Sequence, residues 1–312
     1  MSKDKPIVIF AFSGGNALGP FVAGAFEGLT KAGIKPDIVC GTSTGAICAL
    51  LVAGNPPDRR LPALHRFWTQ VSTGDGPFLV PSRGPARLAA NRFALLQARL
   101  LGRPGLYRPM GAPKADEWPI PALYDLSPLA RTLEDLADFD YLGRGPRLTV
   151  HCTDIQTGEE VIFDSAAGKI KPEHIVASCS LMPDFPPRQV DGRWLADGGF
   201  VANLPLRMAW QAPPGSTLFA IDLFTLPDWP YMSPDALVGL GQDLFFSTQS
   251  RHAVEALRRE RPDIRLHTIT HRRRDEDIAQ HSFEFSAHSV AARWQQGLHA
   301  AETLVQSLAP AG

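Results

Sequence analysis

The chain has 312 residues, of which 44% are hydrophobic and 20% are charged, a composition that is ordinary for a globular enzyme and excludes a disordered or fibrous protein. Its 31 Lys and Arg residues nearly balance its 32 Asp and Glu residues, so the formal net charge of −1 gives no global field that would select nucleic acid as a partner. A chain of this length can bury a large core and form one large α/β domain or two smaller ones.

The N-terminal segment and the cysteines indicate the compartment. The apolar stretch from Ile7 to Phe12 is too short for the core of a signal peptide. Apolar runs elsewhere stay far below the roughly 20 residues that cross a membrane. We therefore expect a soluble, cytoplasmic protein. The four cysteines show no C-x-x-C spacing and have apolar neighbours, which predicts buried free thiols and no metal site; they are Cys40, Cys48, Cys152 and Cys179.

The first predicted strand, residues 7–12, runs directly into a glycine-rich loop, Ser13-Gly14-Gly15-Asn16-Ala17-Leu18-Gly19, and Pro20 fits the first turn of a helix. A glycine-rich loop at a helix N-terminus usually holds an anion. The nucleotide patterns fail, because the Walker motif needs Lys at Pro20 and the dinucleotide fingerprint needs Gly at Asn16. Two interpretations remain: a tight turn, or an oxyanion loop whose N–H groups near Gly15 and Asn16 stabilise negative charge.

The second predicted strand starts at Ile38, breaks at Gly41 and leads into an Ala/Leu-rich helix. Gly41-Thr42-Ser43-Thr44-Gly45 matches the G-x-S-x-G nucleophile elbow, in which a strained turn lifts a serine hydroxyl above the sheet. The pattern is weak alone, because its residues are common. Two strand-to-helix turns so close in sequence imply neighbouring parallel strands with both turns at their carboxyl ends. We therefore expect Ser43 to share one crevice with the glycine-rich loop.

The only strong charge asymmetry follows a predicted helix at residues 58–75. Residues 76–115 contain no Asp or Glu but seven basic residues. Residues 87–101 fit a helix, with Arg92, Arg99 and Arg103 on one side and an apolar stripe of Ala89, Phe93, Leu96 and Leu100 beside them. This segment is either a surface helix with snorkelling arginines or a cap that touches anionic lipid. The Pro- and Gly-rich residues 104–121 predict a long ordered loop or flap.

Further along, the patterns predict helices at residues 126–142, 173–180, 234–261 and 283–308 and strands at 147–152, 160–163, 217–224 and 264–270. Asp191-Gly192 fits a hairpin turn, so Asp197 falls at a strand end, followed by Gly198 and Gly199. From these residues alone, Asp197 is either a turn residue or an acid–base group. The mixed-charge run at residues 272–277 predicts a solvated, self-neutralising loop.

Taken together, these motifs resemble the patatin-like phospholipase family. The resemblance rests on the loop at residues 13–19, the elbow at 41–45 and the Asp-Gly-Gly at 197–199, and it covers about residues 7–225. It implies an α/β three-layer sandwich with a central, mainly parallel sheet. It also implies a lipid acyl hydrolase without a cofactor, in which Ser43 is the nucleophile and Asp197 the base. The oxyanion hole would come from the loop residues Gly14, Gly15, Asn16 and Gly19.

Two loop positions depart from the family pattern. Asn16 stands where a third glycine is common, and Leu18 stands where Arg or Lys is frequent. Asn tolerates a positive φ better than any residue except Gly, so the loop can keep its shape. Without a basic residue at position 18, one source of positive potential near the site is missing. No repeat or linker is visible, so we expect one domain over residues 1–312, with a core at about 7–225, a basic cap or flap at about 76–121 and a C-terminal elaboration at 226–312.

The predicted function is cleavage of carboxylic esters of lipids, of the phospholipase A or esterase type, through an acyl-enzyme. The predicted partners are a lipid or phospholipid substrate and an anionic membrane touched by Arg92, Arg99 and Arg103. Two alternatives stay open. One is a Ser-Asp-His enzyme of the α/β-hydrolase type, because six histidines follow Asp197. The α/β-hydrolase fold, however, places several strands before its elbow, and here only one precedes Ser43. A lipid- or protein-binding module that keeps the fold without the activity is the other. The six histidines are His252, His267, His271, His281, His288 and His299.

Overall fold

The computed structural model describes residues 5–74, 80–111, 122–226, 234–274, 277–278 and 280–308. The central sheet is built from β1 (Val8–Phe12), β2 (Ile38–Thr42), β5 (Arg147–Asp154), β6 (Glu160–Asp164), β7 (Arg188–Val190), β8 (Arg193–Asp197), β9 (Thr217–Asp222) and β10 (Arg265–Thr270). The strand order is β10-β9-β1-β2-β5-β8-β7, with β6 also paired to β5. A separate ribbon pairs β3 (Arg108–Pro109) with β4 (Tyr124–Asp125).

The five strands from β10 to β5 are parallel neighbours, while β6, β7 and β8 are antiparallel additions at one end of the sheet. Strands β1 and β2 in the middle of the sheet are mostly apolar and buried because both of their faces are covered. In β1, for example, Phe10 and Phe12 belong to one hydrophobic core, and Ile9 and Ala11 belong to another. The predicted fold class, with a mainly parallel central sheet, is confirmed.

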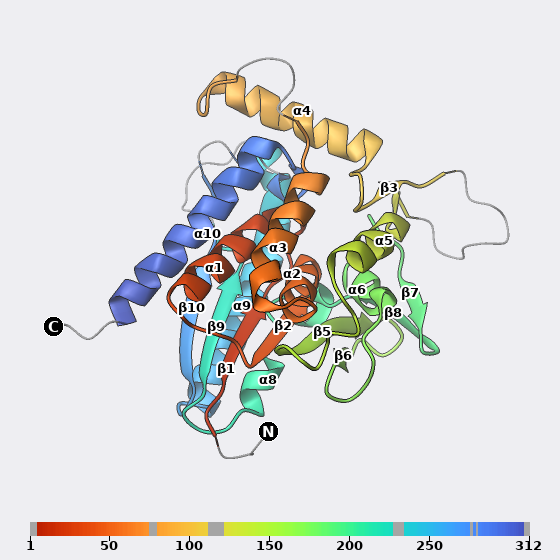
Figure 1. Cartoon of the computed structure of the whole chain (residues 1–312). Helices are drawn as coiled ribbons and strands as arrows, with labels where there is room; N and C mark the ends of the chain where they lie inside the picture. Colours follow the sequence, from red (N-terminus) through yellow and green to blue (C-terminus); the bar gives the residue numbers. More distant parts are fainter. Residues whose placement is uncertain are drawn as a thin grey trace.

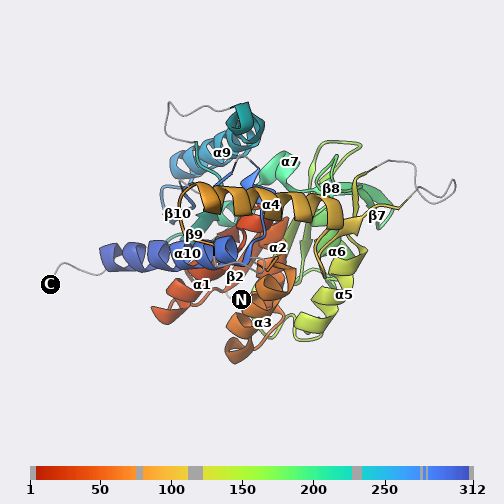
Figure 2. The ribbon, with the colours of Figure 1, turned by 90° about the horizontal axis from the view of Figure 1, so that it is seen from above.

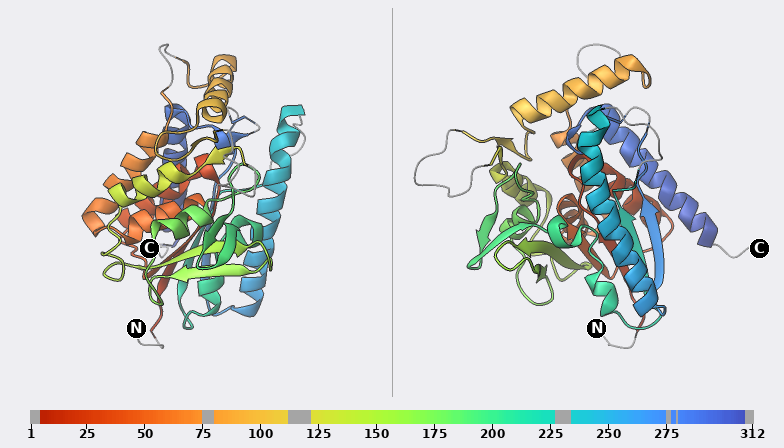
Figure 3. Two further views of the ribbon diagram at one scale, coloured as in Figure 1. Left: turned by 90° about the vertical axis from the view of Figure 1, so that its right-hand side faces the viewer. Right: turned by 180° about the vertical axis from the view of Figure 1, so that it is seen from behind.

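Helices cover both faces of this sheet, so the molecule has three layers (Figure 1, Figure 3). One face carries α1 (Pro20–Lys31), α2 (Thr44–Ala53), α3 (Pro57–Val71), α5 (Ser127–Leu136), α6 (Pro172–Ser178) and α10 (Ala287–Leu308); the other carries α8 (Arg207–Trp210) and α9 (Pro234–Glu260). The basic helix α4 (Pro85–Leu101) lies across the top of the molecule (Figure 2). Three short helices complete the fold: η1 (Asn16–Leu18), α7 (Gly199–Ala202) and η2 (His281–Phe283).

Most predicted elements are present, and the differences have local causes. The predicted helix 126–142 ends at Leu136, where Asn55 Nδ2 donates to the Leu136 carbonyl at 2.9 Å. The last helix begins at Ala287 rather than 283. The Phe285 carbonyl accepts a hydrogen bond from the Thr73 N–H at 2.7 Å and so does not take part in the helix. The solvated loop predicted at residues 272–277 is wrong for Asp277, whose side chain is fully buried.

Some expectations concern parts that the structure describes only partly. Of the predicted cap or flap, residues 75–79 and 112–121 lie outside the described residues, and the predicted domain organisation stays a prediction. The four cysteines are buried free thiols, as expected. None of the described helices combines the length and the hydropathy that crossing a bilayer requires.

Helices α1 and α10 pack with their backbones in contact. A Cβ atom added to Gly297 would lie 2.0 Å from the Phe21 carbonyl oxygen, and one added to Gly24 would lie 1.9 Å from that of Trp294. Neither position can take a larger residue unless the helices separate.

We therefore expect Gly297→Ala to lower the melting temperature by several degrees, since the added methyl group forces α10 away from α1. The matched control is Gly241→Ala in α9, where an added Cβ meets no atom within 4 Å. This control should be neutral or stabilising by up to about 1 kcal/mol, because Ala is the better helix former. Thermal unfolding followed by circular dichroism checks both variants. Equal melting temperatures for the two would contradict the tight helix contact.

Candidate active site

Strand β5 brings the two predicted catalytic residues together. β2 pairs with β5 up to the partners Thr42 and His151, and β8 pairs with it from the partners Asp197 and Cys152 onward. Strand β6 pairs with residues 149–153 and so occupies the other edge of β5. β2 and β8 therefore share one edge and meet end to end, since one runs parallel and the other antiparallel to β5. Ser43 follows the end of β2 directly, and Asp197 is the last residue of β8.

A buried serine fixes this junction. Ser178, at the end of α6, accepts a hydrogen bond from the Ser43 N–H at 2.9 Å. Its hydroxyl donates to the His151 carbonyl at 2.7 Å. Thr153 Oγ1 donates to the Asp197 carbonyl at 2.9 Å from the same strand β5. No motif marks Ser178 in the sequence, because its role depends on a strand 27 residues earlier.

The elbow at Ser43 has the strained backbone that its sequence pattern predicts. Ser43 has φ 55° and ψ −127°, a conformation that costs a non-glycine residue roughly 1–3 kcal/mol. Helix α2 begins at the next residue, so its N-terminal end faces the serine. Gly45 is required because an added Cβ would lie 2.2 Å from the Phe12 carbonyl oxygen. Gly41 is the fourth residue of β2, buried beneath the turn.

The glycine-rich loop lies against the elbow. A Cβ added to Gly14 would lie 2.8 Å from Ser43 Cβ, so only glycine allows this approach. Asn203, which follows α7, holds the loop in two ways: its carbonyl accepts from the Gly14 N–H, and its Nδ2 donates to the Gly14 carbonyl, both at 3.2 Å. Asn16 has φ 50°, in the left-handed region that Asn tolerates.

The N–H groups of the loop are not equally free. The Gly14 N–H donates to Asn203, and the Gly19 N–H donates to the Asn16 carbonyl. Within the described residues, the N–H groups of Gly15 and Asn16 donate to no protein acceptor, and both residues line the pocket in front of Ser43. Of the four predicted oxyanion residues, two can donate through their main chain. Gly14 and Gly19 shape the loop instead.

Asp197 is a buried carboxyl group with an unusual protonation equilibrium. It is 2% exposed, and burial raises its pKa from the model-compound value of 3.8 to about 7. The Ser43 hydroxyl and the Gly199 N–H act in the opposite direction and limit this rise. Oδ1 accepts the Gly199 N–H at 2.8 Å, while Oδ2 accepts no hydrogen bond from the described residues. Gly199 is thus the donor of the Asp-Gly-Gly turn, and Gly198 is the N-cap of α7.

The pocket above these residues has a volume of about 610 Å³, including its open mouth. Its floor is formed by Gly15, Asn16, Ser43, Asp197 and Asn203. The remaining wall is mainly aliphatic and aromatic, and no described histidine lines it. The wall residues are Thr44, Ile47, Phe67, Trp68, Leu106, Leu126, Cys179, Leu181, Phe185, Gln242, Phe246 and Phe283. Three of them, Gln242, Phe246 and Phe283, come from the C-terminal part of the chain.

The basic helix α4 is oriented differently from the prediction. Arg99 points inward, pairs with Asp184 and lies over the Phe283 ring, with Cζ 3.6 Å from the ring centroid. Arg103 is 7% exposed and donates to the Ser72 carbonyl. Both guanidinium groups thus make contacts within the protein, and the predicted membrane contact of these two arginines stays a prediction. Arg92 is exposed. The outward face of α4 consists of Phe93, Leu96, Leu100 and Leu101, which are 53–69% exposed.

Comparison with known proteins gives one family match and several likenesses. The profile described as patatin-like phospholipase matches residues 10–210. The uncharacterized protein YqhO of Bacillus subtilis (strain 168) is 26% identical over 210 residues, which are 62% of this chain. The match spans 64% of the length of that relative.

Two solved structures are similar over 97% of this chain. Human GIVD cytosolic phospholipase A2, in complex with methyl γ-linolenyl fluorophosphonate, has a TM-score of 0.50 at 12% identity, over 58% of its own chain. VipD from Legionella pneumophila has a TM-score of 0.45 at 13% identity, over 67% of its chain. The first likeness shows that the fold is shared.

The raised pKa of Asp197 predicts a pH-dependent cost to stability. The unfolded state releases this proton near pH 4 and the folded state near pH 7, so the penalty grows as pH rises between these values and is complete above them. Asp197→Asn removes the buried charge, and we expect it to raise the melting temperature by more at pH 8 than at pH 5. Thermal scans at both pH values measure this difference. Asp140→Asn, at a side chain that is 86% exposed, is the control and should show no such gain.

Proposed function

This chain belongs to the patatin-like phospholipase family, and we propose that it is a serine hydrolase that cleaves carboxylic ester bonds of lipids through a Ser43–Asp197 dyad. The observation that carries the proposal is the meeting of β2 and β8 on one edge of β5. This arrangement puts a strained serine and a buried carboxyl group into one apolar pocket. Family membership supports lipid hydrolysis, and the pocket geometry supports the choice of residues.

In the proposed reaction, Asp197 accepts the proton of the Ser43 hydroxyl through its unengaged oxygen Oδ2 while Ser43 Oγ attacks the ester carbonyl. The N–H groups of Gly15 and Asn16 donate to the resulting oxyanion. As the tetrahedral intermediate collapses, Asp197 returns the proton to the leaving alcohol and Ser43 keeps the acyl group. Water then attacks the acyl-enzyme, with Asp197 again accepting and returning a proton.

The pocket wall supports an acyl chain as the group that is bound. Beyond the polar floor, the wall presents Phe67, Trp68, Phe185, Phe246 and Phe283 together with aliphatic side chains. Such a surface binds hydrocarbon by removing apolar area from water, at about 25 cal/mol per Å². The raised pKa of Asp197 also suits a general base that works near neutral pH.

The Ser-Asp-His alternative has less support. His271 and His281 are buried, and burial lowers the pKa of each, to about 4 and about 3 respectively, so that both stay neutral. Neither lines the pocket. The non-catalytic alternative is addressed by the first experiment below.

We further propose that the protein docks on a lipid surface through apolar side chains rather than through Arg99 and Arg103. Helix α4 buries its polar residues Arg87 and Asn91 and exposes four of its large apolar ones, which is the reverse of an ordinary surface helix. In the described residues, the other exposed large apolar side chains are Leu123, Leu226, Leu244, Phe245 and Leu308.

Two groups of these exposed side chains, those of α4 and of α9, lie near the pocket. Arg99 of α4 covers pocket residue Phe283, and Leu244 and Phe245 lie on α9 between pocket residues Gln242 and Phe246. Figure 2 shows α4 crossing the top of the molecule near α9. Clustered exposed apolar residues mark interaction surfaces, and a lipid aggregate is the apolar partner that also supplies the substrate. Peripheral membrane binding fits the predicted cytoplasmic location, which stays a prediction.

Ser43→Ala should lower hydrolysis of p-nitrophenyl esters by at least about 10²-fold while leaving the melting temperature nearly unchanged. Ser307→Ala, at an exposed serine of α10, is the control. A fluorophosphonate probe should modify wild-type Ser43, located by mass spectrometry of the labelled peptide. The kcat/KM of wild type should rise as pH passes through about 7, because the base must lose its proton.

The outcomes separate the alternatives. A wild type that is neither active nor labelled would support the binding module. Activity that survives in Ser43→Ala would assign the chemistry to another residue.

Replacing Phe93, Leu96 and Leu100 together by Ser should weaken binding to phospholipid vesicles by about 10²-fold, since each apolar side chain contributes about 1 kcal/mol on partial insertion. Hydrolysis of a short water-soluble ester should stay within about twofold of wild type. Leu308→Ser removes an exposed apolar residue at the end of α10 and serves as the control. Vesicle sedimentation with neutral and anionic lipids gives the readout, and Arg92→Glu tests the charge contribution. Unchanged binding of the triple variant would rule out this docking surface.

A further inference from the structure

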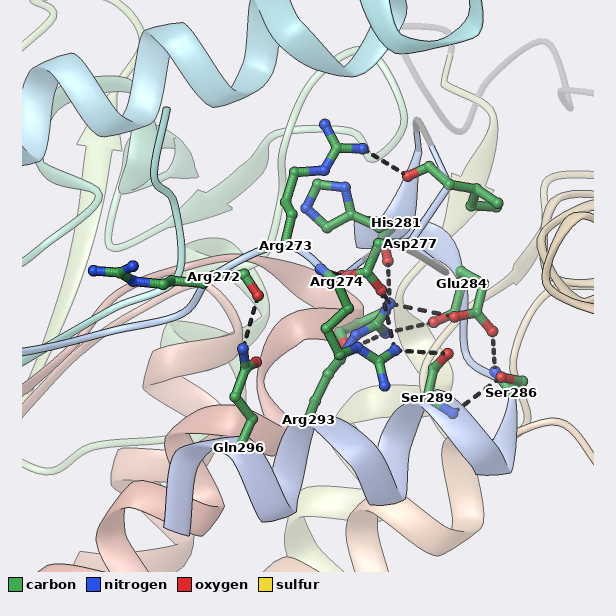
Figure 4. A network of polar contacts seen from close by, with 12 residues as sticks. Arg272, Arg273, Arg274, Asp277, His281, Glu284, Ser286, Ser289, Arg293 and Gln296 are labelled. Atoms are coloured by element: carbon green, nitrogen blue, oxygen red, sulfur yellow. Dashed lines mark hydrogen bonds and ion pairs between the residues drawn. The ribbon is translucent and has the colours of Figure 1, made fainter. Parts of the chain in front are cut away.

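A buried arginine on α10 contacts the glycine-rich loop. Arg293 is 0% exposed, and it comes from a part of the chain that lies beyond the family match at residues 10–210. Figure 4 shows it extending from α10 into a network with Asp277, Glu284 and Arg274. None of these residues lines the pocket, so the proposed mechanism leaves them without a role.

The guanidinium group of Arg293 joins three segments of the chain. Nη1 donates to the Ala17 carbonyl at 2.9 Å and to the Glu284 carbonyl at 2.7 Å. Nη2 donates to the His281 carbonyl and to Glu284 Oε2, both at 3.2 Å, and lies 3.6 Å from Asp277 Oδ1. Ala17 is the middle residue of η1, within the glycine-rich loop.

The positive charge is kept in the interior by two buried carboxylates. Burial by itself would raise the pKa of Asp277, but Arg293 and Arg274 outweigh it and hold this pKa below its ordinary value. Glu284 is 1% exposed and also accepts the Ser286 N–H at 2.7 Å. A buried ion cluster seldom stabilises a fold more than apolar residues of the same volume would. Its presence behind the loop therefore calls for an explanation other than stability.

The contact at Ala17 acts on the peptide group between Ala17 and Leu18, one residue after Asn16. In η1, the Leu18 N–H donates to the Gly15 carbonyl and the Gly19 N–H donates to the Asn16 carbonyl. The Ala17 carbonyl is the one that receives Arg293. This contact pins the chain next to Asn16, whose φ of 50° is the strained point of the loop and whose N–H is one of the two candidate donors. The loop itself brings no cation to this place, because its residue Leu18 is apolar and fully buried.

We infer that Arg293 is a positioning residue for the oxyanion loop, which it holds through the Ala17 carbonyl. This inference rests on the proposed function. A fixed donor geometry favours the charged tetrahedral state over the neutral ester, so the contact acts on kcat rather than on KM. The C-terminal segment then completes the active site in two ways: Phe246 and Phe283 line its wall, and Arg293 orients its donors.

The test compares Arg293→Met, Arg293→Lys and Arg274→Met in the full chain. Arg274 pairs with Asp277 in the same network and donates to Ser289 Oγ, whereas the Ala17 carbonyl receives Arg293, which makes Arg274 the matched control. With a water-soluble p-nitrophenyl ester, Arg293→Met should lower kcat by about 10- to 100-fold with KM within about twofold. Arg293→Lys should recover part of this loss. Arg274→Met should lower the melting temperature without lowering kcat at a temperature where it is folded.

Arg293→Met leaves Glu284 without its buried cation, while Asp277 keeps Arg274, and this loss risks unfolding. A second variant, Arg293→Met with Glu284→Gln, removes the uncompensated carboxylate, keeps the pair of Asp277 and Arg274, and should fold while showing the same loss of kcat. An unchanged kcat in this folded variant, or equal losses in Arg274→Met and Arg293→Met, would overturn the inference. Fluorophosphonate labelling of wild-type Ser43 is measured alongside. An unlabelled, inactive wild type overturns the proposed function as well, whereas a labelled wild type with unaffected Arg293 variants overturns the present inference alone.

Discussion

Strands β2 and β8 pair with the same edge of β5 and run toward each other, and the rest of the candidate site depends on this pairing. Because β2 is parallel to β5 and β8 is antiparallel, their carboxyl ends meet between the partners His151 and Cys152. The turn after each strand then faces the turn after the other. Ser178 closes the gap with hydrogen bonds to the Ser43 N–H and the His151 carbonyl. The fold thus brings the Ser43 hydroxyl and the Asp197 carboxyl group, which are far apart in the sequence, to one junction.

Polar side chains from distant parts of the chain hold the loops around this junction. Asn203 binds both main-chain groups of Gly14, and Gln249 of α9 accepts the Asn203 N–H at 2.6 Å and donates to the Gly199 carbonyl. On the other side, Arg293 holds Ala17. The proposed base destabilises the fold at neutral pH and above, because Asp197 is buried with a pKa raised to about 7. Rigid polar supports around a destabilised carboxyl group are the expected pattern where a site trades stability for reactivity.

Sequence patterns predicted what depends on local chemistry. The elbow at Ser43, the hairpin at Asp191 and the strand end at Asp197 follow from glycine positions and apolar periodicity, and the structure has all three. The positioning roles of Ser178 and Arg293 were not predicted. Each depends on a hydrogen bond to a main-chain carbonyl that is distant in the sequence, and a single Ser or Arg does not indicate such a bond. The prediction of a solvated loop at residues 272–277 was wrong for Asp277 for the same reason. Neighbouring opposite charges predict ion pairs within the loop, but Asp277 is buried beside Arg293 of α10. Helix α4 was predicted as a helix, but periodicity cannot say which of its faces turns outward.

The ladder between β5 and β8 is only three partners long, from Cys152–Asp197 to Asp154–Leu195. Side chains alternate between the two sides of a strand, so a slip of β8 by one position would swing the carboxylate of Asp197 to the opposite side of the sheet. The tight turn at Asp191 and Gly192, both with positive φ, sets how β8 lines up with β7. The hydrogen bond from Thr153 Oγ1 to the Asp197 carbonyl ties β8 to β5 and so opposes that slip. A single hydroxyl group on β5 therefore helps to keep the carboxyl group of Asp197 on the same side of the sheet as the hydroxyl group of Ser43.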